Sequence, residues 1–321
     1  MKTAFLEANH WHLRPHLSAL KKSDEVKLVG LSGKGMLPTE ASETMGVPLY
    51  DNYNELLDKE DVDFVYIFGT AKQTPSIIKD VVARGIPFFA EKPCATNSED
   101  LVPVLAEIKK KGVINSVPFG RRFSPVVERY KDMMYESAQK GQMHFIFRYI
   151  SDTPLRYVNL GCAWGLDPVE AGGGCLMNLG GHFIDLVRYI TKEEIVGVKA
   201  ALNYKMFDTE VDDYATMLLT TTNGNTATVE VGFSNPGYPY ELYCMTGTGF
   251  YISGESSKQY SCVRTGGEIE TFDFPRSDYY EECLADMVSA VKGEKKPLVS
   301  LEDGYESLKV VNRAYANAKI L

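Results

Sequence analysis

Apolar positions in the first 120 residues alternate between short continuous runs and longer segments with helical spacing. Strands that alternate with helices form βαβ units, which place parallel strands side by side with helices on both faces. This rhythm predicts a doubly wound parallel sheet of the Rossmann type. The short runs predict strands at 2–6, 27–31, 63–68, 87–90 and 113–117, and the longer segments predict helices at 13–20, 38–45, 75–84 and 101–111.

The rhythm changes after Arg121, where strand candidates begin to follow one another directly. Consecutive strands joined by turns predict a mostly antiparallel sheet, here within an α+β domain. We therefore expect two domains, a Rossmann-type domain over 1–119 and an α+β domain over 120–321. The second contains predicted strands at 143–150, 197–204, 214–222, 226–233 and 240–247, and predicted helices at 125–138, 176–190, 278–292 and 301–319.

Composition narrows the possible partners and the compartment. Lys and Arg total 34 against 43 Asp and Glu, a formal charge of −9, which argues against nucleic acid or an anionic membrane as a partner. The six cysteines include no C-x-x-C pair, so neither a disulfide framework nor a zinc ribbon is indicated. With no signal peptide and no apolar run near the roughly 18 residues of a membrane span, we expect a cytoplasmic protein.

The loop after the first strand is where a Rossmann domain carries G-x-G-x-x-G, so that backbone can approach a diphosphate. Here it reads Glu7-Ala8-Asn9-His10-Trp11-His12, without glycine and with an acid at its start. After the second strand, Ser32 and Lys34 stand where an NAD-selective protein carries Asp or Glu. A hydroxyl and an ammonium group can bind a 2′-phosphate, which slightly favours NADP over NAD. The alternative is that Ser32 and Lys34 belong to an ordinary solvated turn with no role in cofactor binding.

Three of the five histidines, His10, His12 and His16, lie close to Glu7 and suggest a transition-metal site. Nothing else in the sequence supplies a matching ligand signature. We therefore expect no metal, and keep a metal-dependent hydrolase or lyase as the weakest alternative function.

Two further segments carry candidate chemistry. Lys92 follows the strand at 87–90, at the carboxyl edge of a parallel sheet where such folds bind ligands, and Pro93 restricts its backbone. At helical spacing, Asn178, His182 and Asp185 form one polar stripe. Three glycines at 172–174 precede this helix, which indicates close approach of a ligand or of another backbone.

These segments resemble the glucose-fructose oxidoreductase, inositol dehydrogenase and MocA group of NAD(P)-dependent oxidoreductases. The resemblance rests on four motifs in family order across nearly the whole chain. They are E-K-P at 91–93, G-R-R-F-S-P at 120–125, G-G-G-x-x-x-N-x-G-x-H-x-x-D at 172–185 and P-L-V-S-L-E-D-G at 297–304. The resemblance implies a Rossmann domain followed by an α+β domain whose open sheet forms a homodimer or homotetramer interface.

The resemblance also implies roles for single residues. Lys92 matches the lysine that contacts substrate and cofactor, and His182 matches the usual acid/base, so hydride passes between nicotinamide and a hydroxyl of a sugar, polyol or related small molecule. Asn178 replaces the Asp of the motif and would orient His182 or bind substrate. The departures in the first loop leave a non-catalytic binding or regulatory protein as the alternative. Expected cofactor contacts are Asn9, His10, Trp11, His12, Ser32, Lys34, Thr70, Glu91, Lys92 and Arg121.

Overall fold

The computed structural model covers the chain and describes all residues except 137–140, 238, 256–258, 265, 268 and 274–278. Its contacts divide the chain into two compact units, each assembled from three segments. The first unit contains Met1–Gly120, Leu155–Gly172 and Tyr280–Leu308, and the second contains Arg121–Pro154, Gly173–Tyr279 and Lys309–Leu321. The predicted division into one domain over 1–119 and another over 120–321 stays a prediction.

The first unit is built on a six-stranded sheet in the order β3-β2-β1-β4-β5-β6, with every neighbouring pair parallel. β4 and β5 are buried at every position, as expected when helices cover both faces. The order reverses between β2 and β4, so the carboxyl end of β1 lies at the switch point where such sheets bind ligands. The strands are β1 (Lys2–Leu6), β2 (Lys27–Ser32), β3 (Leu49–Tyr50), β4 (Phe64–Ile67), β5 (Phe88–Ala90) and β6 (Asn115–Ser116).

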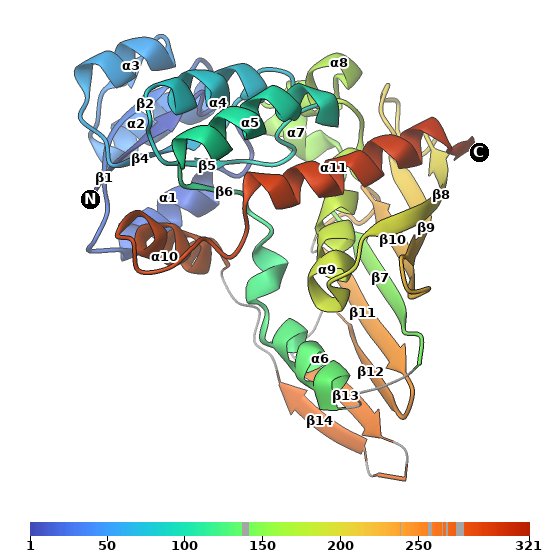
Figure 1. Cartoon of the computed structure of the whole chain (residues 1–321). Helices are drawn as coiled ribbons and strands as arrows, with labels where there is room; N and C mark the ends of the chain where they lie inside the picture. The colour runs from blue at the N-terminus through green and yellow to red at the C-terminus, as the bar shows by residue number, and fades with distance from the viewer. Residues whose placement is uncertain (137–140, 238, 256–258, 265, 268, 274–278) are drawn as a thin grey trace. The chain divides into compact units, whose positions relative to one another are not determined.

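Helices flank this sheet, with α4 and α5 on the side opposite α1 and α10 (Figure 1). The helices of the first unit are α1 (Leu13–Lys22), α2 (Met36–Met45), α3 (Tyr53–Lys59), α4 (Thr74–Ala83), α5 (Val102–Lys111), α7 (Leu155–Asn159), α8 (Pro168–Ala171) and α10 (Tyr279–Val291). α11 (Leu301–Ala316) begins in the first unit, where Ser300 and Asp303 cap it reciprocally.

The second unit is built on a nine-stranded sheet in the order β14-β13-β12-β11-β7-β10-β9-β8-β15. All pairs are antiparallel except β7 with β10 and β8 with β15. The predicted fold class, a Rossmann-type sheet followed by a mostly antiparallel one, is confirmed. The strands are β7 (His144–Ile150), β8 (Ile195–Asn203), β9 (Tyr214–Thr221), β10 (Thr226–Gly232), β11 (Tyr240–Gly247), β12 (Phe250–Glu255), β13 (Gln259–Arg264), β14 (Ile269–Asp273) and β15 (Lys319–Ile320).

The helical part of the second unit departs from its prediction at one place. The helix predicted over 176–190 begins as a π-helix, η4 (Leu176–Gly180), and continues as α9 (Gly181–Thr191). A Cβ on Gly180 would lie 2.7 Å from Leu176 Cδ1 and 3.2 Å from Met217 Cε, so a side chain there would require these two side chains to shift. α6 (Pro125–Glu136) is the remaining helix longer than one turn among the described residues of this unit. No helix in the described part of the chain is long and apolar enough to cross a membrane.

Candidate functional site

The glycine-free loop after β1 keeps a turn that usually requires glycine. Glu7 has φ of +50°, in the left-handed region. The loop after β2 supports it, because Glu7 N–H donates to Ser32 Oγ at 3.0 Å and Ala8 N–H donates to Ser32 O at 2.8 Å. A Cβ on Gly33 would lie 2.9 Å from Ala8 N, so the close approach relies on a glycine in the second loop.

Residues 155–172 of the same unit pack against this loop. The Trp11 ring lies 4.8 Å from Trp164 and 4.7 Å from Tyr157. Trp164 Nε1 donates to Asn9 O, and Asn9 Nδ2 donates to Gly161 O. Two of the expected cofactor contacts, Asn9 and Trp11, therefore also hold the loop against a segment 150 residues away in sequence.

A pocket of about 440 Å³ opens at the carboxyl ends of the parallel strands. Of the expected cofactor contacts, Lys34 and Thr70 line this pocket, whereas Ser32 is fully buried beneath Glu7. Thr70 Oγ1 donates to Glu170 Oε2 at 2.8 Å. Burial raises the pKa of Glu7, against hydrogen bonding by Ser32. The lining residues are Glu7, Asn9, Lys34, Asp51, Asn52, Phe68, Gly69, Thr70, Gln73 and Trp164.

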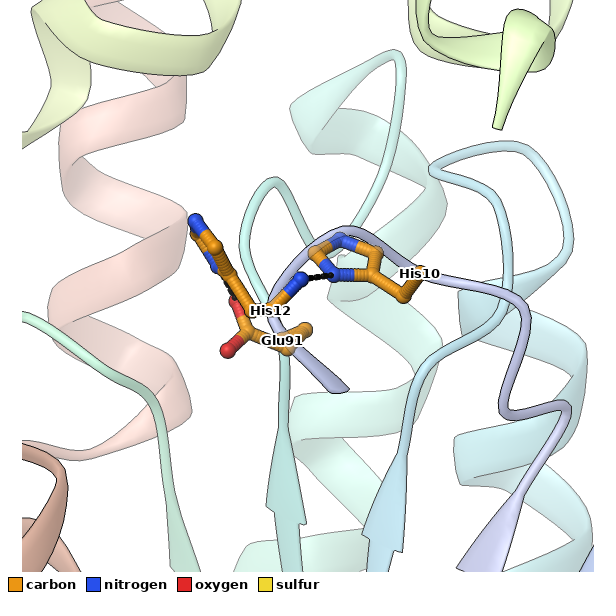
Figure 2. A group of neighbouring side chains, drawn as sticks. All are labelled: His10, His12 and Glu91. Atoms are coloured by element: carbon orange, nitrogen blue, oxygen red, sulfur yellow. Dashed lines mark hydrogen bonds and ion pairs between the residues drawn. The ribbon is translucent and has the colours of Figure 1, made fainter. Parts of the chain in front are cut away.

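Glu91 lies at the centre of a buried imidazole cluster. Its Oε2 is 3.0 Å from His12 Nδ1 and accepts the Lys92 N–H at 3.2 Å, while its Oε1 is 2.7 Å from His16 Nε2. His10 joins the group through its Nδ1, which accepts the His12 N–H (Figure 2). The sequence marked these histidines and Glu91 separately, and the fold brings them together.

The protonation states of this cluster follow from burial and charge. Burial lowers the pKa of His12 to about 4 against the pull of Glu91, and lowers that of His10 well below its usual range. Burial acts to raise the pKa of Glu91, but the charge that His12 carries when protonated and the hydrogen bonds of His12 and His16 keep it well below its usual value. At neutral pH, Glu91 is therefore a carboxylate that accepts a hydrogen bond from the neutral imidazole of His12.

Lys92 directly follows Glu91 at the end of β5 and is 6 % exposed. The Lys92–Pro93 peptide bond is cis. The lysine lies in the first unit, whereas the other two expected catalytic residues, Asn178 and His182, lie in the second. Within the second unit Asn178 belongs to the π-helix and His182 to the first turn of α9, and both are buried.

The loop before the π-helix is held by a residue that the sequence did not mark, Asp212. Its Oδ1 accepts the Gly174 N–H and the Tyr315 hydroxyl, at 2.7 and 2.6 Å, and its Oδ2 accepts the Leu176 N–H at 2.7 Å. A Cβ on Gly174 would lie 1.9 Å from Asp212 O. At Gly174, the glycine thus serves a close approach to another backbone, one of the two expected possibilities.

The two arginines after β6 are both paired within the second unit. Arg122 Nε donates to Asp185 Oδ2 at 2.9 Å, and its Nη2 donates to Oδ1 at 2.5 Å. Arg121 donates to Tyr243 Oη and to Glu241 Oε1, both at 2.8 Å, and its guanidinium lies over the Phe183 ring. Asp185, the last residue of the predicted polar stripe, thus anchors α9.

A doubly wound sheet with a pocket at its switch point, followed by an α+β unit with a large sheet, defines the class of two-domain oxidoreductases with a Rossmann domain. Residues 11–119 match the family model described as oxidoreductase family, NAD-binding Rossmann fold, and residues 143–255 match the GFO/IDH/MocA C-terminal domain. The chain belongs to the GFO/IDH/MocA family of oxidoreductases. The expectation of an NAD(P)-dependent dehydrogenase or reductase of CH–OH groups is confirmed at the level of this family.

Individual relatives agree with this assignment. The chain is 26 % identical over 308 residues to a myo-inositol 2-dehydrogenase of Thermotoga maritima, covering 91 % of this chain and 89 % of that protein. An Agrobacterium radiobacter oxidoreductase in complex with NAD+, L-tartaric acid and magnesium has a TM-score of 0.85 at 17 % identity, covering 99 % of this chain and 96 % of that one. KijD10, a 3-ketoreductase from Actinomadura kijaniata in complex with NADP and TDP-benzene, has a TM-score of 0.84 at 20 % identity, covering 100 % and 98 %. The comparisons lend no support to the non-catalytic alternative.

Proposed function

We propose that the protein transfers hydride between a nicotinamide cofactor and a CH–OH carbon of a sugar or cyclic polyol. The observation that carries this proposal is Lys92, a buried lysine at the carboxyl end of β5, two strands from the switch point of a family-typical Rossmann sheet. An ammonium group there stabilises the alkoxide that develops when a hydroxyl is oxidised. The relative named as a myo-inositol dehydrogenase supports a polyol as the substrate class.

His182 is proposed to accept the hydroxyl proton, and Asn178 to orient the imidazole or to contact substrate. Because Asn178 is neutral, it does not stabilise an imidazolium as a carboxylate would. Arg121, engaged by Glu241 and Tyr243, is proposed to support this part of the second unit through Phe183.

The pocket of the first unit fits the adenosine half of a dinucleotide. Its carboxylates and amides are acceptors for ribose hydroxyls, and Lys34 supplies a positive charge. The left-handed turn at Glu7 keeps the backbone course that a glycine would give. When bound, the nicotinamide supplies the hydride acceptor, while the chain supplies binding, orientation and proton transfer.

Between the two cofactors, we infer a preference for NAD. The sequence-based inclination toward NADP used Ser32 and Lys34 together, but Ser32 is buried and bonded to Glu7. Lys34 shares the pocket with the carboxyl groups of Glu7 and Asp51. A 2′-phosphate there would meet two acidic groups and one basic group, whereas ribose hydroxyls can donate to both acids.

The cofactor step has a direct readout. The chain has two tryptophans, Trp11 and Trp164, whose rings lie 4.8 Å apart, and Trp164 lines the pocket. Titration with NADH and NADPH should therefore quench tryptophan fluorescence, with tighter binding of NADH. No quenching by either cofactor at millimolar concentration would contradict the proposal and favour a non-catalytic role.

The chemical step is tested by Lys92→Met and His182→Asn on a polyol found by screening inositols, aldoses and cyclic diols for NADH formation. We expect kcat/KM to fall by about 10²–10⁴ in each variant, with NADH affinity in His182→Asn close to that of the wild type. Lys79→Met and His144→Asn, at exposed positions, are matched controls. If the two test variants turn over substrate as fast as their controls, the roles of Lys92 and His182 are wrong.

We also propose that the open face of the second sheet forms a homodimer or homotetramer. Ile146 and Leu218 are 45 % and 50 % exposed, and both pair with Thr228 of β10, so they lie in one row across β7, β10 and β9. Burying apolar side chains of this kind is favourable. Leu218→Glu should lower the mass measured by light scattering, and a wild-type monomer would exclude this assembly.

A further inference from the structure

We infer that His10, His12 and Glu91 form a binding site for a divalent first-row transition-metal ion, with Zn²⁺ as the ion that the donor set suits best. One nitrogen of each imidazole and one carboxylate oxygen lie within 4.8 Å of one another (Figure 2). We predicted no metal from the sequence because no ligand outside the histidine run was evident. The fold supplies that ligand from the end of β5, 79 residues away from His12. This inference is independent of the proposed hydride transfer.

The distances are close to those that an ion needs. Zinc binds imidazole nitrogen and carboxylate oxygen at about 2.0–2.2 Å, which places neighbouring ligand atoms roughly 3.3 Å apart. His12 Nδ1 and Glu91 Oε2 are already 3.0 Å apart. The widest separation in the group, at most 4.8 Å, must close by about 1.5 Å. The Trp11 ring is stacked on the His10 ring, with 4.0 Å between the ring centroids.

The surroundings of the three ligands have the properties of a built site. His16 holds the other oxygen of Glu91 at 2.7 Å, as the second layer of a metal site usually does. The His16 ring is itself enclosed by Tyr66, Phe68, Phe89 and Tyr280. Glu91 is 2 % exposed and His12 is 21 % exposed, so the cluster is sheltered yet open on the His12 side.

The hydrogen bonds of the cluster show which interactions an ion would replace. A proton lies between His12 Nδ1 and Glu91 Oε2, and His10 Nδ1 accepts the His12 N–H. An ion would replace the shared proton and take a lone pair from His10. Two imidazoles with one carboxylate suit zinc, cobalt, nickel or iron better than magnesium or calcium, which prefer oxygen ligands.

The test uses the whole chain, expressed without an affinity tag and freed of bound metal with a chelator. Co²⁺ is then added as a spectroscopic substitute for Zn²⁺. We expect about one Co²⁺ per chain, with visible ligand-field bands and no thiolate charge-transfer band, because the donors are nitrogen and oxygen. A competing titration with Zn²⁺ should remove these bands. Thiolate bands would instead place the ion at one of the six cysteines and overturn the proposal.

Variants identify the ligands. His12→Asn should weaken Zn²⁺ binding in equilibrium dialysis by about 100-fold or more, whereas His144→Asn on β7 should leave it unchanged. Glu91→Gln should act like His12→Asn, but its buried site carries a risk of misfolding. If the wild type binds less than a stoichiometric amount, or if His12→Asn binds as tightly as His144→Asn, the site does not exist.

Discussion

Asp212→Asn tests whether the loop before the π-helix depends on a buried carboxylate that has no role in the proposed chemical step. Asp212 is fully buried, and its two oxygens accept from Gly174 N–H, Leu176 N–H, the Tyr315 hydroxyl and the Cys175 thiol. An asparagine of the same shape has one oxygen and one NH2 group. Two of the four donors must therefore face a donor, whichever way the amide is turned.

The loss of unfolding free energy can be estimated from these hydrogen bonds. A hydrogen bond to a charged group contributes about 1.5–3 kcal/mol, so the loss of two lowers the unfolding free energy by roughly 3–6 kcal/mol. For a unit of the size of the second one, this loss corresponds to a fall in Tm of about 10 °C. Activity should fall too, since displacement of the π-helix by about 1 Å moves Asn178 and His182 and can cost on the order of 100-fold in kcat.

The assay pairs urea unfolding with steady-state kinetics, and Asp208→Asn is its control because Asp208 is exposed on the same stretch of chain. Tyr315→Phe should recover little of the loss in an Asp212→Asn background, because its hydroxyl accounts for one donor of four. If Asp212→Asn stays within about 0.5 kcal/mol of Asp208→Asn, the loop does not depend on this carboxylate and the reasoning is refuted.

Two further substitutions test a buried ion pair of the second unit and the pocket of the first unit. Asp185→Asn should destabilise the protein by about 3–5 kcal/mol, because it leaves Arg122 charged and buried, and the double variant Arg122→Met with Asp185→Leu should recover part of that loss in the same unfolding assay. Equal losses in the single and double variants would contradict an uncompensated charge as the cause. Asp51→Asn should tighten NADPH binding by about tenfold in the fluorescence titration, since it removes one acidic group from the pocket. Unchanged NADPH affinity would remove Asp51 from the basis of the NAD preference.

The sequence predicted the fold where periodicity was strong and missed it where pairing partners decided the structure. The βαβ rhythm identified five of the parallel strands because each is a short apolar run bounded by turns. β12, β13 and β14 were not predicted, since their sequences mix polar and apolar residues without a long apolar run, and ladders to one another stabilise them. α3 was missed although Asn52 caps it by accepting the Glu55 N–H, a local signal within reach of sequence reading.

The site shows the same division between local and long-range information. The motifs marked Lys92, Asn178 and His182 because each belongs to a short recognisable run. The contact of Glu91 with His16 joins residues 75 apart, and that of Asp212 with Gly174 joins residues 38 apart. Only the sheet order brings such groups together, so no spacing rule along the chain predicts them.

The loss of the glycine fingerprint has a physical explanation in this loop. A non-glycine residue in the left-handed region costs about 1–2 kcal/mol, and Glu7 carries that cost at φ of +50°. Two hydrogen bonds to Ser32 and the packing of Trp11 on Trp164 offset it within the same unit. Glycine is one way to make this turn, and tertiary contacts to residues of another segment are a second. A fingerprint search along one loop detects the first way alone, so the glycine-free sequence argues neither against the fold nor against a cofactor bound by backbone amides.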